Sequence, residues 1–376
     1  MSSVLPRSSH KPLILHVIND LSTGGAELLL SNTIRLLPDF EHIVAYLFSG
    51  SDLIENFRQQ GVELICLGHR GWSSMLASSR KLRSIIKEEK PLLVHSHLFQ
   101  ATICTRLAVP ASVPLISTIH SLYSQDLFGK SVKSLWVARL TLKKRHTLIG
   151  VSDCVMQDYL SYVRFRGKRF ILHNFLPDSL FRKRNDQLPG DVLKLVAVGN
   201  LKEAKNYHYL LEVFKHLKEV KVSLDIYGQG PLHKELEIHI QREGLNVRLC
   251  GSMNDVSRIL PQYDFFIQAS SHEGFGLSVI EAMANGIPVI LSEIPVFREI
   301  TNNLAVFFPL DSAIRAAETV KMALSNKQPN LYDSAFEFAS KSYSAALYRQ
   351  KLLDIYKEVT AADHQSNTFI TKLLSA

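Results

Sequence analysis

The residues with the clearest chemistry lie in SHEGFGLSVIEAMANG, residues 271–286, where two carboxylates flank a glycine-rich turn. Glu273 stands directly before Gly274, and Glu281 follows in the apolar run after Gly276. Because glycine has no Cβ, the backbone N–H groups of such a turn can approach a ligand closely. A helix that starts there also directs its unpaired N–H groups and the positive end of its dipole at the same point, which favours a phosphate.

The two glutamates indicate which groups flank that phosphate. A carboxylate repels a phosphate but accepts hydrogen bonds from neutral hydroxyls. We therefore expect sugar hydroxyls at Glu273 and ribose hydroxyls at Glu281, which together predict a nucleotide-sugar ligand. The spacing alone leaves an alternative open, in which both residues are surface acids beside a structural glycine turn.

The stretches around these residues predict a strand, a loop and a helix that ends at Gly286. Similar strands and helices alternate along the whole chain, which predicts the α/β class with two doubly wound, Rossmann-like halves. Ligands bind at the carboxyl ends of strands in such sheets, where residues 271–276 fall. The predicted strands are 13–18, 42–48, 62–67, 92–97, 115–120, 147–152, 193–199, 222–228, 247–251, 263–270, 287–292 and 304–309. The predicted helices include 25–37, 77–88, 131–145, 206–218, 232–243, 254–261, 276–285, 311–325 and 344–359.

The length also favours two domains, because 376 residues exceed what one hydrophobic core usually supports. The polar stretch 175–191, with two prolines and a glycine, suits a linker. We expect an N-terminal domain over 1–180, a C-terminal domain over 181–343, and a helix and tail over 344–376 that packs back on the N-terminal domain. The cleft between two facing domains is the default ligand site.

The net charge of +8 belongs to the first half, since residues 1–180 hold 21 Lys and Arg against 13 Asp and Glu. The simplest interpretation is a solvated basic face. The alternatives are that these residues bind an anionic membrane surface or a phosphate-bearing ligand. Nucleic acid is a poorer fit, because only Phe165 offers a stacking ring among the basic clusters. Those clusters contain seven basic residues: Lys143, Lys144, Arg145, Arg164, Arg166, Lys168 and Arg169.

The location of the protein follows from two further patterns. No apolar run approaches the roughly 18 residues of a membrane span, and the N-terminus has no signal-peptide pattern. The four cysteines, at 66, 104, 154 and 250, form no C-x-x-C pair, which is typical of reduced core thiols. We expect a cytoplasmic protein, with peripheral attachment to the inner face of the membrane where the basic clusters meet anionic lipid.

The chain resembles the retaining glycosyltransferases of family 4, which have the two-domain GT-B fold. EGFGLSVIEAMANGIPVI is similar to the family's E-x7-E motif, and GGAE, HSH, TIHS, VGNLKEAKN and YGQGP resemble its other signatures in order. The resemblance extends from about residue 13 to about residue 358. It implies transfer of a sugar from a nucleotide-sugar to a saccharide or lipid-linked acceptor in bacterial surface polysaccharide or lipopolysaccharide synthesis.

The same resemblance implies roles for individual residues. His120 stands at the reaction centre, Lys205 pairs with the donor pyrophosphate, Glu273 binds the transferred sugar, and Glu281 binds the ribose. His97 matches the H-x-H strand end, with a structural role equally open. Backbone groups cradle the phosphates, the sugar and the base at Gly24, Gly25, Gly251, Gly274, Phe275, Gly276 and Leu277.

Two positions depart from the family pattern. Asn200 stands where an arginine commonly pairs with the pyrophosphate, and Lys202 is close enough in sequence to compensate or to be a plain surface residue. The segment before Glu299 lacks the usual glycine pair. Neither change removes the central acids, so we expect an active enzyme.

The expected mechanism is front-face transfer with retention, in which a phosphate oxygen accepts the proton of the incoming hydroxyl. Protein catalysis is then positioning and electrostatic stabilisation of the leaving diphosphate. The sequence contains no Asp-x-Asp triplet, so we expect no required metal and no cofactor besides the donor substrate. The alternatives are a sugar-nucleotide isomerase or epimerase of the same shape and a catalytically silent sugar-nucleotide-binding subunit.

Overall fold

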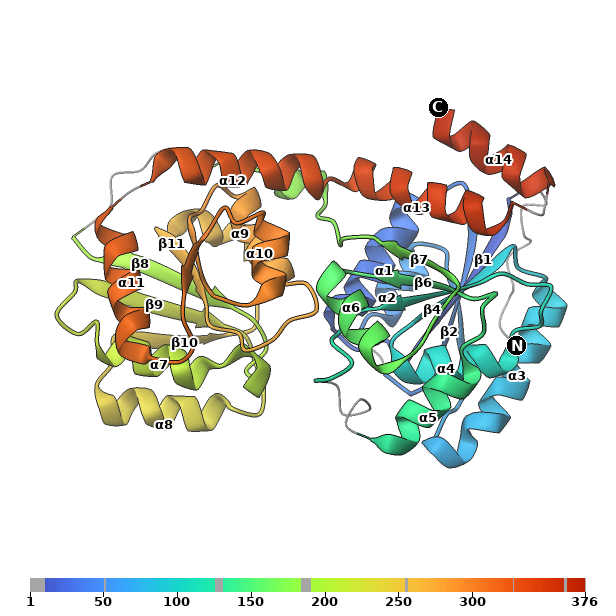
Figure 1. Ribbon diagram of the computed structural model, residues 1–376, viewed down its shortest axis with the longest axis horizontal. Coiled ribbons are helices and arrows are strands. Elements are labelled where there is room, and N and C mark those ends of the chain that lie inside the picture. The colour runs from blue at the N-terminus through green and yellow to red at the C-terminus, as the bar shows by residue number, and fades with distance from the viewer. Residues whose placement is uncertain are drawn as a thin grey trace. The chain divides into compact units, whose positions relative to one another are not determined.

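The computed structural model describes residues 11–50, 52–125, 131–183, 191–253, 256–326, 328–361 and 364–375. The chain forms two compact units, which are described separately (Figure 1). Unit 1 comprises residues up to 151, 155–173 and 348–376, and unit 2 comprises 152–154 and 174–347.

Unit 1 is built on a seven-stranded sheet in which every strand pair is parallel, in the order β3-β2-β1-β4-β5-β6-β7. The central strands β1 and β4 are buried along their whole length, as expected when helices cover both faces of a parallel sheet. The strands are β1 Leu13–Ile18, β2 Glu41–Tyr46, β3 Glu63–Cys66, β4 Leu93–His97, β5 Leu115–Ile119, β6 Thr147–Gly150 and β7 Lys168–Ile171. The helices are α1 Gly25–Leu36, α2 Ile54–Gln59, α3 Met75–Glu89, α4 Phe99–Ala108, α5 Val132–Thr141, α6 Asp153–Tyr162, α13 Ala345–Val359 and α14 His364–Ser375.

The C-terminal helices return to unit 1, as the sequence predicts. From Tyr348 onward they belong to that unit, and in Figure 1 the red α13 lies beside its blue and green elements. The Tyr348 hydroxyl lies 3.1 Å from Oγ1 of Thr33, and the Tyr356 hydroxyl lies 2.9 Å from Nδ1 of His95. Buried hydrogen bonds at both ends of α13 therefore fix it on the sheet.

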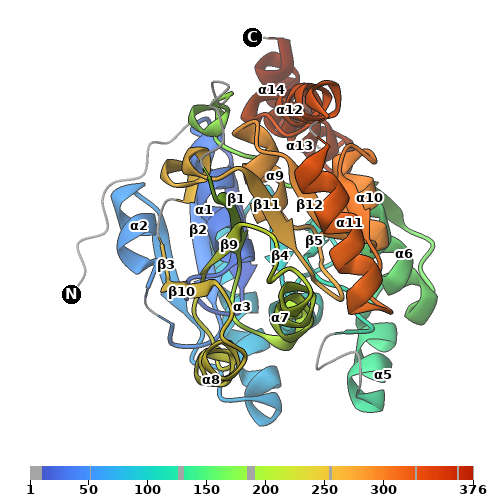
Figure 2. The same cartoon turned by 90° about the vertical axis from the view of Figure 1, so that its left-hand side faces the viewer.

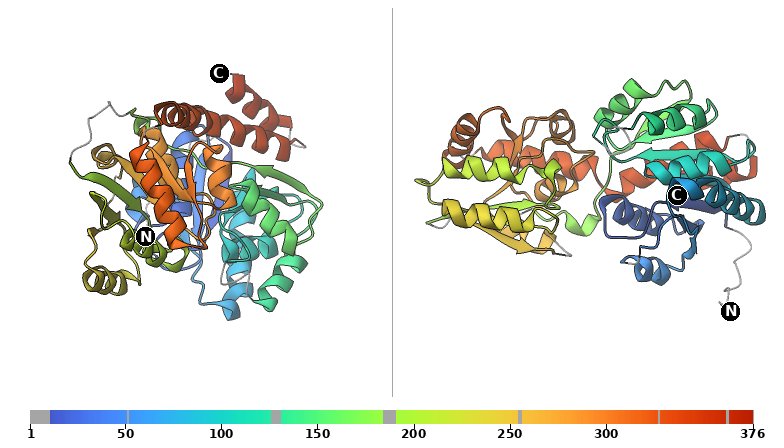
Figure 3. Two further views of the ribbon diagram at one scale, coloured as in Figure 1. Left: turned by 60° about the vertical axis from the view of Figure 1, so that its left-hand side comes forward. Right: turned by 90° about the horizontal axis from the view of Figure 1, so that it is seen from below.

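Unit 2 has a six-stranded sheet, again parallel throughout, in the order β10-β9-β8-β11-β12-β13. One face packs its apolar side chains against α7, α8 and α11, while α12 packs on α9 (Figures 2 and 3). The strands are β8 Leu193–Val198, β9 Val222–Tyr227, β10 Val247–Gly251, β11 Phe265–Gln268, β12 Val289–Ser292 and β13 Val306–Phe308. The helices are α7 Tyr207–Lys215, α8 His233–Glu243, α9 Leu277–Ala284, α10 Pro295–Thr301, α11 Ala313–Ser325 and α12 Pro329–Ser342.

Each predicted strand is present, although most are shorter than predicted. Two local differences stand out. Residues 168–171, half of them counted as a basic cluster, form the edge strand β7, whose charged side chains face solvent. The helix predicted over 254–261 is instead two short 3-10 turns, Val256–Arg258 and Leu260–Gln262, because Pro261 cannot continue an α-helix; residues 254–255 lie outside the described part.

The predicted linker contains the 3-10 turn Asp178–Leu180, and its residues 184–190 lie outside the described part. None of the described helices is both long and apolar enough to cross a membrane.

Candidate functional site

The glycine turn of residues 274–276 leads into α9, as the sequence predicts. Gly276 is the N-cap, with φ of 98° and no side-chain cap, so the first N–H groups of α9 have no side-chain oxygen from their own cap. A Cβ at Gly276 would lie 3.0 Å from the Phe297 ring and 3.1 Å from Ile300 Cδ1. Both the left-handed backbone and the close packing therefore require glycine here.

The other end of α9 is fixed by a Schellman motif. Gly286 has φ of 67°, its N–H donates to the carbonyl of Met283, and the N–H of Ile287 donates to that of Ala282. Glu281 lies in the second turn of α9 and is partly exposed. The helix is thus held at both ends, which fixes the position of this carboxylate relative to the glycine turn.

Lys205 and Glu273, assigned to different parts of the donor, are in direct contact. Nζ of Lys205 lies 2.5 Å from Oε1 of Glu273, and the Ser270 hydroxyl donates to the same oxygen over 2.8 Å. Both side chains are mostly buried, with 17% and 14% exposed. Lys205 and Glu273 therefore form one polar centre at the carboxyl ends of β8 and β11.

The loop after β8 explains how Lys205 reaches that centre. The lysine ends the 3-10 turn Glu203–Lys205, and its stem crosses Gly199, where a Cβ would lie 2.7 Å from Cε. The buried Tyr207 hydroxyl donates to the Gly199 carbonyl over 3.0 Å. Asn200 and Lys202 in the same loop are exposed. A side chain at position 199 would have to displace the lysine stem from the strand end.

The turn after β9 approaches this loop very closely. A Cβ on Gly228 would lie 2.0 Å from the Gly199 carbonyl oxygen, and one on Gly230 would lie 2.4 Å from that of Leu201. The N–H of Gly228 donates to the carbonyl of Gly251, which ends β10 with φ of 75°. Gly228 and Gly230 of the YGQGP motif and the predicted donor-binding Gly251 thus bring the ends of β8, β9 and β10 together.

Phe275 and Leu277 flank the turn in different ways. The Phe275 side chain is buried and makes an edge-on contact with the Tyr343 ring at 5.7 Å between centroids, so it is its backbone that remains for a ligand. Leu277 is partly exposed and opens α9, and Gly274 is partly exposed as well.

In unit 1, Gly24 and Gly25 begin α1 directly after the loop that follows β1. A Cβ on Gly24 would lie 2.3 Å from Oε2 of Glu27, so the carboxyl group folds back over the glycine. Burial raises the pKa of Glu27 to about 7. Sequence reasoning named the two glycines and overlooked Glu27, although its place in the first turn of the helix was a visible signal.

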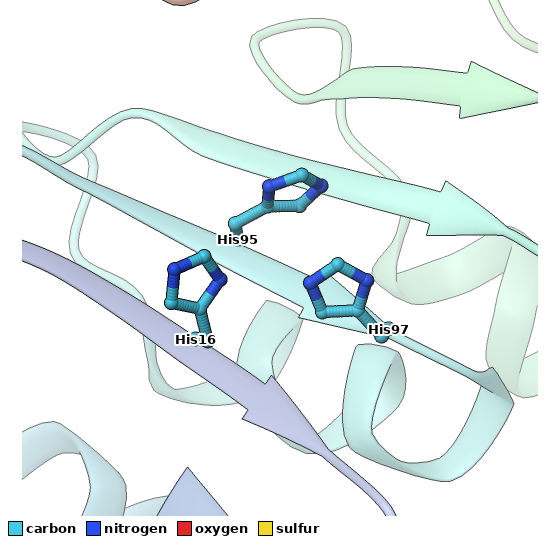
Figure 4. Close-up of side chains that lie close together, drawn as sticks. All are labelled: His16, His95 and His97. Carbon is cyan, nitrogen blue, oxygen red and sulfur yellow. The ribbon is translucent and has the colours of Figure 1, made fainter. Parts of the chain in front are cut away.

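A row of buried histidines crosses the sheet of unit 1 beneath α13. The register pairs His16 of β1 with His95 of β4, and His97 lies two residues further along the same face (Figure 4). Burial lowers the pKa of His95 to about 3 and those of His16 and His97 well below the usual range. These imidazoles are therefore neutral at pH 7.

The three histidines bring one ring nitrogen each within 4.8 Å of the others, a spacing that could hold a metal ion. The ring contacts fit this poorly. The His95 and His97 rings lie 4.4 Å apart at 30°, closer to stacking than to convergence on one point, and both nitrogens of His95 already have partners in Thr118 and Tyr356. A metal would have to displace one of those hydrogen bonds.

His120 follows the end of β5 and contacts His97, its Nε2 lying 3.3 Å from Nδ1 of His97. The structure thus brings together the stronger and the weaker histidine candidates. Burial lowers the pKa of His120 to about 4, so at pH 7 it is a neutral hydrogen-bonding group. It lines a pocket of unit 1 together with Thr118, Ser121 and Tyr123.

Comparisons with known proteins show the family and the fold of the chain. The family model described as "Glycosyltransferase Family 4" matches residues 23–179, and that described as "Glycosyl transferases group 1" matches residues 180–341. The chain is 26% identical to the putative glycosyltransferase EpsF of Bacillus subtilis over 95% of this chain and 99% of that one.

Two further proteins extend the comparison. An Escherichia coli UDP-Gal:alpha-D-GlcNAc-diphosphoundecaprenol alpha-1,3-galactosyltransferase is 28% identical over 57% of this chain and 60% of its own length. The crystal structure of Anabaena Alr3699/HepE in complex with UDP-glucose superposes with a TM-score of 0.78 at 18% identity, covering 92% of this chain and 100% of that one. Two parallel-sheet units and these matches establish the GT-B fold, and the chain belongs to glycosyltransferase family 4.

Proposed function

We propose that this glycosyltransferase moves a hexosyl group from a nucleotide-sugar to a saccharide or lipid-linked acceptor with retention of anomeric configuration. The observation that carries the proposal is the contact of Lys205 with Glu273 beside the free start of α9. The cation and the N–H groups at the start of α9 match a phosphate, and the carboxylate beside them matches the hydroxyls of its sugar.

Donor binding would exchange partners within this centre. The diphosphate would take the ammonium of Lys205 and the N–H groups of α9, while hydroxyls of the sugar would replace that ammonium at Glu273. Glu281, in the second turn of α9, would accept from the ribose hydroxyls. The contact of Lys205 with Glu273 would thus be replaced by two charge-assisted contacts with the donor.

Bond cleavage increases the negative charge on the diphosphate, so Lys205 and the helix start would stabilise the transition state more than the bound donor. The acceptor hydroxyl would approach from the same face and pass its proton to a phosphate oxygen. His120, neutral at pH 7, would position sugar hydroxyls by hydrogen bonding. We propose that no metal is required, since no Asp-x-Asp triplet is present in the sequence.

The direct test has three readouts. Thermal shift with UDP-, GDP- and ADP-sugars identifies the donor, because a ligand at 100 times its Kd adds about 2.7 kcal/mol of stability. Transfer of a radiolabelled sugar followed by NMR of the product reports its anomeric configuration. EDTA should leave the rate unchanged; inversion of configuration or loss of activity with EDTA would contradict the proposal.

Two other functions remain as outcomes of that test. Conversion of the donor without release of free nucleotide would indicate an isomerase or epimerase. Binding without any turnover would indicate a silent subunit. The presence of Glu273, Lys205 and His120 together argues against the silent subunit, because a protein without catalytic activity has no need of all three.

We further propose that the acceptor belongs to bacterial surface polysaccharide or lipopolysaccharide synthesis and is reached at the cytoplasmic face of an anionic membrane. The E. coli relative carries a diphosphoundecaprenol acceptor in its name. In unit 1, α5 exposes three large apolar side chains at helical spacing, namely Val132 at 70%, Trp136 at 57% and Leu140 at 75%.

The opposite side of α5 fully buries the small residues Ser134, Ala138 and Thr141, and Leu135 and Val137 pack partly buried against the core. An ordinary surface helix keeps its large apolar side chains toward the core, whereas α5 also presents three of them to solvent. The exposed Lys133 and Arg139 flank the apolar stripe, and the exposed basic residues 143–145 follow it. Residues 131–145 contain no acid. An apolar stripe with a basic border suits an anionic membrane surface.

A further inference from the structure

Arg106 of α4 is a buried charge without a carboxylate partner among the described residues. Its side chain is 4% exposed. Among the residues that the structure describes, both terminal nitrogens hydrogen-bond only to the Tyr159 hydroxyl, each over 3.3 Å, and the buried Nε has no hydrogen-bond partner. A buried arginine is normally paired with an acid and uses its five donors, so this guanidinium is far from satisfied.

Nearby charged residues add to the excess of positive charge around Arg106. The pKa of His146 is lowered to about 3 by its burial and by the positive charges of Arg106, Arg145 and Lys143. Arg145 donates to the carbonyl of Val109, at the end of α4. The surroundings of Arg106 therefore hold several cations and a neutral imidazole, which is the electrostatic setting of an anion site.

The unsatisfied guanidinium lines the same pocket of unit 1 as His120. The pocket extends between α4, the end of β5 and α6, with Thr118, Ser121 and Tyr159 also in its wall. Ligands of parallel sheets bind at strand ends, and His120 follows the end of β5. An anionic group on Arg106 would therefore belong to a molecule that also reaches His120.

We propose that Arg106 is a binding residue for an anionic oxygen group, a carboxylate or a phosphate, carried by the acceptor. The assignment to the acceptor rests on the proposed function; the anion site itself does not. The guanidinium offers a planar fork that matches both groups with two parallel hydrogen bonds, and the anion would neutralise the buried charge. The acceptor class is thereby narrowed to anionic molecules.

The binding test uses inorganic phosphate and, in a second arm, acetate, at constant ionic strength. We expect phosphate, acetate or both to raise the Tm of the wild-type protein, and the response that remains once the donor centre is removed by Lys205→Ala to vanish when Arg106→Met is added. Adding Arg139→Met instead, which removes an exposed arginine of unit 1, should keep that response. A wild-type protein that responds to neither anion, or a variant with Lys205→Ala and Arg106→Met that responds as Lys205→Ala does, overturns the site.

The variants are interpretable because they separate charge from packing. Without anions, Arg106→Met should match or exceed the wild-type Tm, since it replaces an uncompensated buried charge by an apolar side chain. Should it fail to fold, Arg106→Lys keeps the charge, loses the fork, and should reduce the anion response at least about tenfold in apparent Kd. An unchanged apparent Kd in Arg106→Lys overturns the role of the fork.

Kinetics connect the site to the acceptor. Arg106→Met should raise the KM for the acceptor and leave donor hydrolysis and donor affinity unchanged. Anion binding with no change in acceptor KM overturns the assignment to the acceptor. Absence of donor turnover in the wild type would refute the proposed function instead, while leaving the anion response of Arg106 to stand on the thermal data.

Discussion

Lys205 and Glu273, 68 positions apart in the chain, are joined by a 2.5 Å contact. Both side chains are mostly buried, with 17% of the Lys205 side chain and 14% of the Glu273 side chain exposed. The pair therefore keeps two charges compensated until a donor separates them. A ligand that offered only a phosphate or only hydroxyls would leave one partner unpaired, which favours a donor that offers both.

Replacing Lys205 by alanine should lower turnover more than donor affinity. The interaction strengthens as the phosphate becomes a leaving group, so the loss falls mainly on the transition state. Calorimetry gives the donor affinity and steady-state kinetics give kcat. The exposed Lys202→Ala serves as the control and should change both far less. An equal loss in both quantities, or a loss of affinity alone, would contradict the leaving-group role.

Glu281→Ala should weaken binding of the free nucleotide, because ribose hydroxyls lose a charged acceptor worth about 1.5–3 kcal/mol per hydrogen bond. Isothermal calorimetry with the nucleoside diphosphate measures this without any catalytic step. Glu281→Gln keeps the shape of the side chain and a neutral acceptor. Its nucleotide affinity should lie between those of the wild type and Glu281→Ala. Unchanged nucleotide affinity in the alanine variant would remove Glu281 from the site.

Gly228→Ala should destabilise unit 2. A Cβ there would lie 2.0 Å from the Gly199 carbonyl oxygen, and the glycine has φ of 155°, so the loops after β8 and β9 must separate. We expect a loss of about 1–3 kcal/mol in urea unfolding together with weaker donor binding. Gly244→Ala is the matched control, because it has φ of 59° with open space around its Cβ. Equal losses in both variants would show that backbone strain alone is at work.

Stability should fall as the pH rises through the range set by Glu27. Its pKa is raised from 4.5 to about 7, so the folded state binds the proton more tightly than the unfolded state does. The stability that this proton contributes is present below pH 4.5 and is lost as the pH rises toward about 7, amounting to at most about 3 kcal/mol. Glu27→Gln should flatten this part of the urea-unfolding pH profile. A variant with the wild-type profile would assign the slope to other groups.

The sequence predicted the glycine turn, the start of α9 and the strands that carry them, because each depends on local residue types. It did not predict the contact of Lys205 with Glu273. The two residues were assigned to different parts of a ligand, and only the fold shows that they meet without one. The proposed anion site at Arg106 was missed for a related reason. Nothing near Arg106 in the sequence reveals that this arginine faces the core, since burial depends on α6 and β5.

The edge strand β7 and helix α5 show a second limit. The basic residues in 164–169 did not predict the strand β7, Lys168–Ile171, although an edge strand tolerates charged residues at positions that face solvent. In α5 the apolar residues predict a helix, yet sequence periodicity cannot tell which face is buried. The small residues Ser134 and Ala138 face inward and Trp136 faces outward, which only packing decides.

The last prediction concerns that face of α5. The protein should bind vesicles of anionic phosphatidylglycerol and not those of neutral phosphatidylcholine, and the binding should weaken with salt as the Debye length falls from about 10 Å at 0.1 M to about 3 Å at 1 M. The seven basic residues of segments 143–145 and 164–169 are all exposed and would contribute about 1 kcal/mol each near the surface. Vesicle sedimentation across a salt series measures the effect. Neutralising these seven residues should abolish binding, whereas Lys221→Gln with Lys234→Gln, exposed lysines of unit 2, should not.

The apolar stripe allows a sharper readout, because the chain has only two tryptophans. Trp72→Phe leaves Trp136 as the single reporter, and its emission should shift to the blue when anionic vesicles are added, since the indole would enter the headgroup region. Val132→Ser with Leu140→Ser should weaken sedimentation with anionic vesicles. Ile238→Ser and Met322→Ser, which replace exposed apolar residues of unit 2, should not weaken it. Vesicle binding that does not depend on lipid charge and salt, or Trp136 emission that does not shift, would contradict the membrane role of α5. The exposed stripe would then be a surface for another partner. Sedimentation velocity would show whether a second copy of the chain covers it.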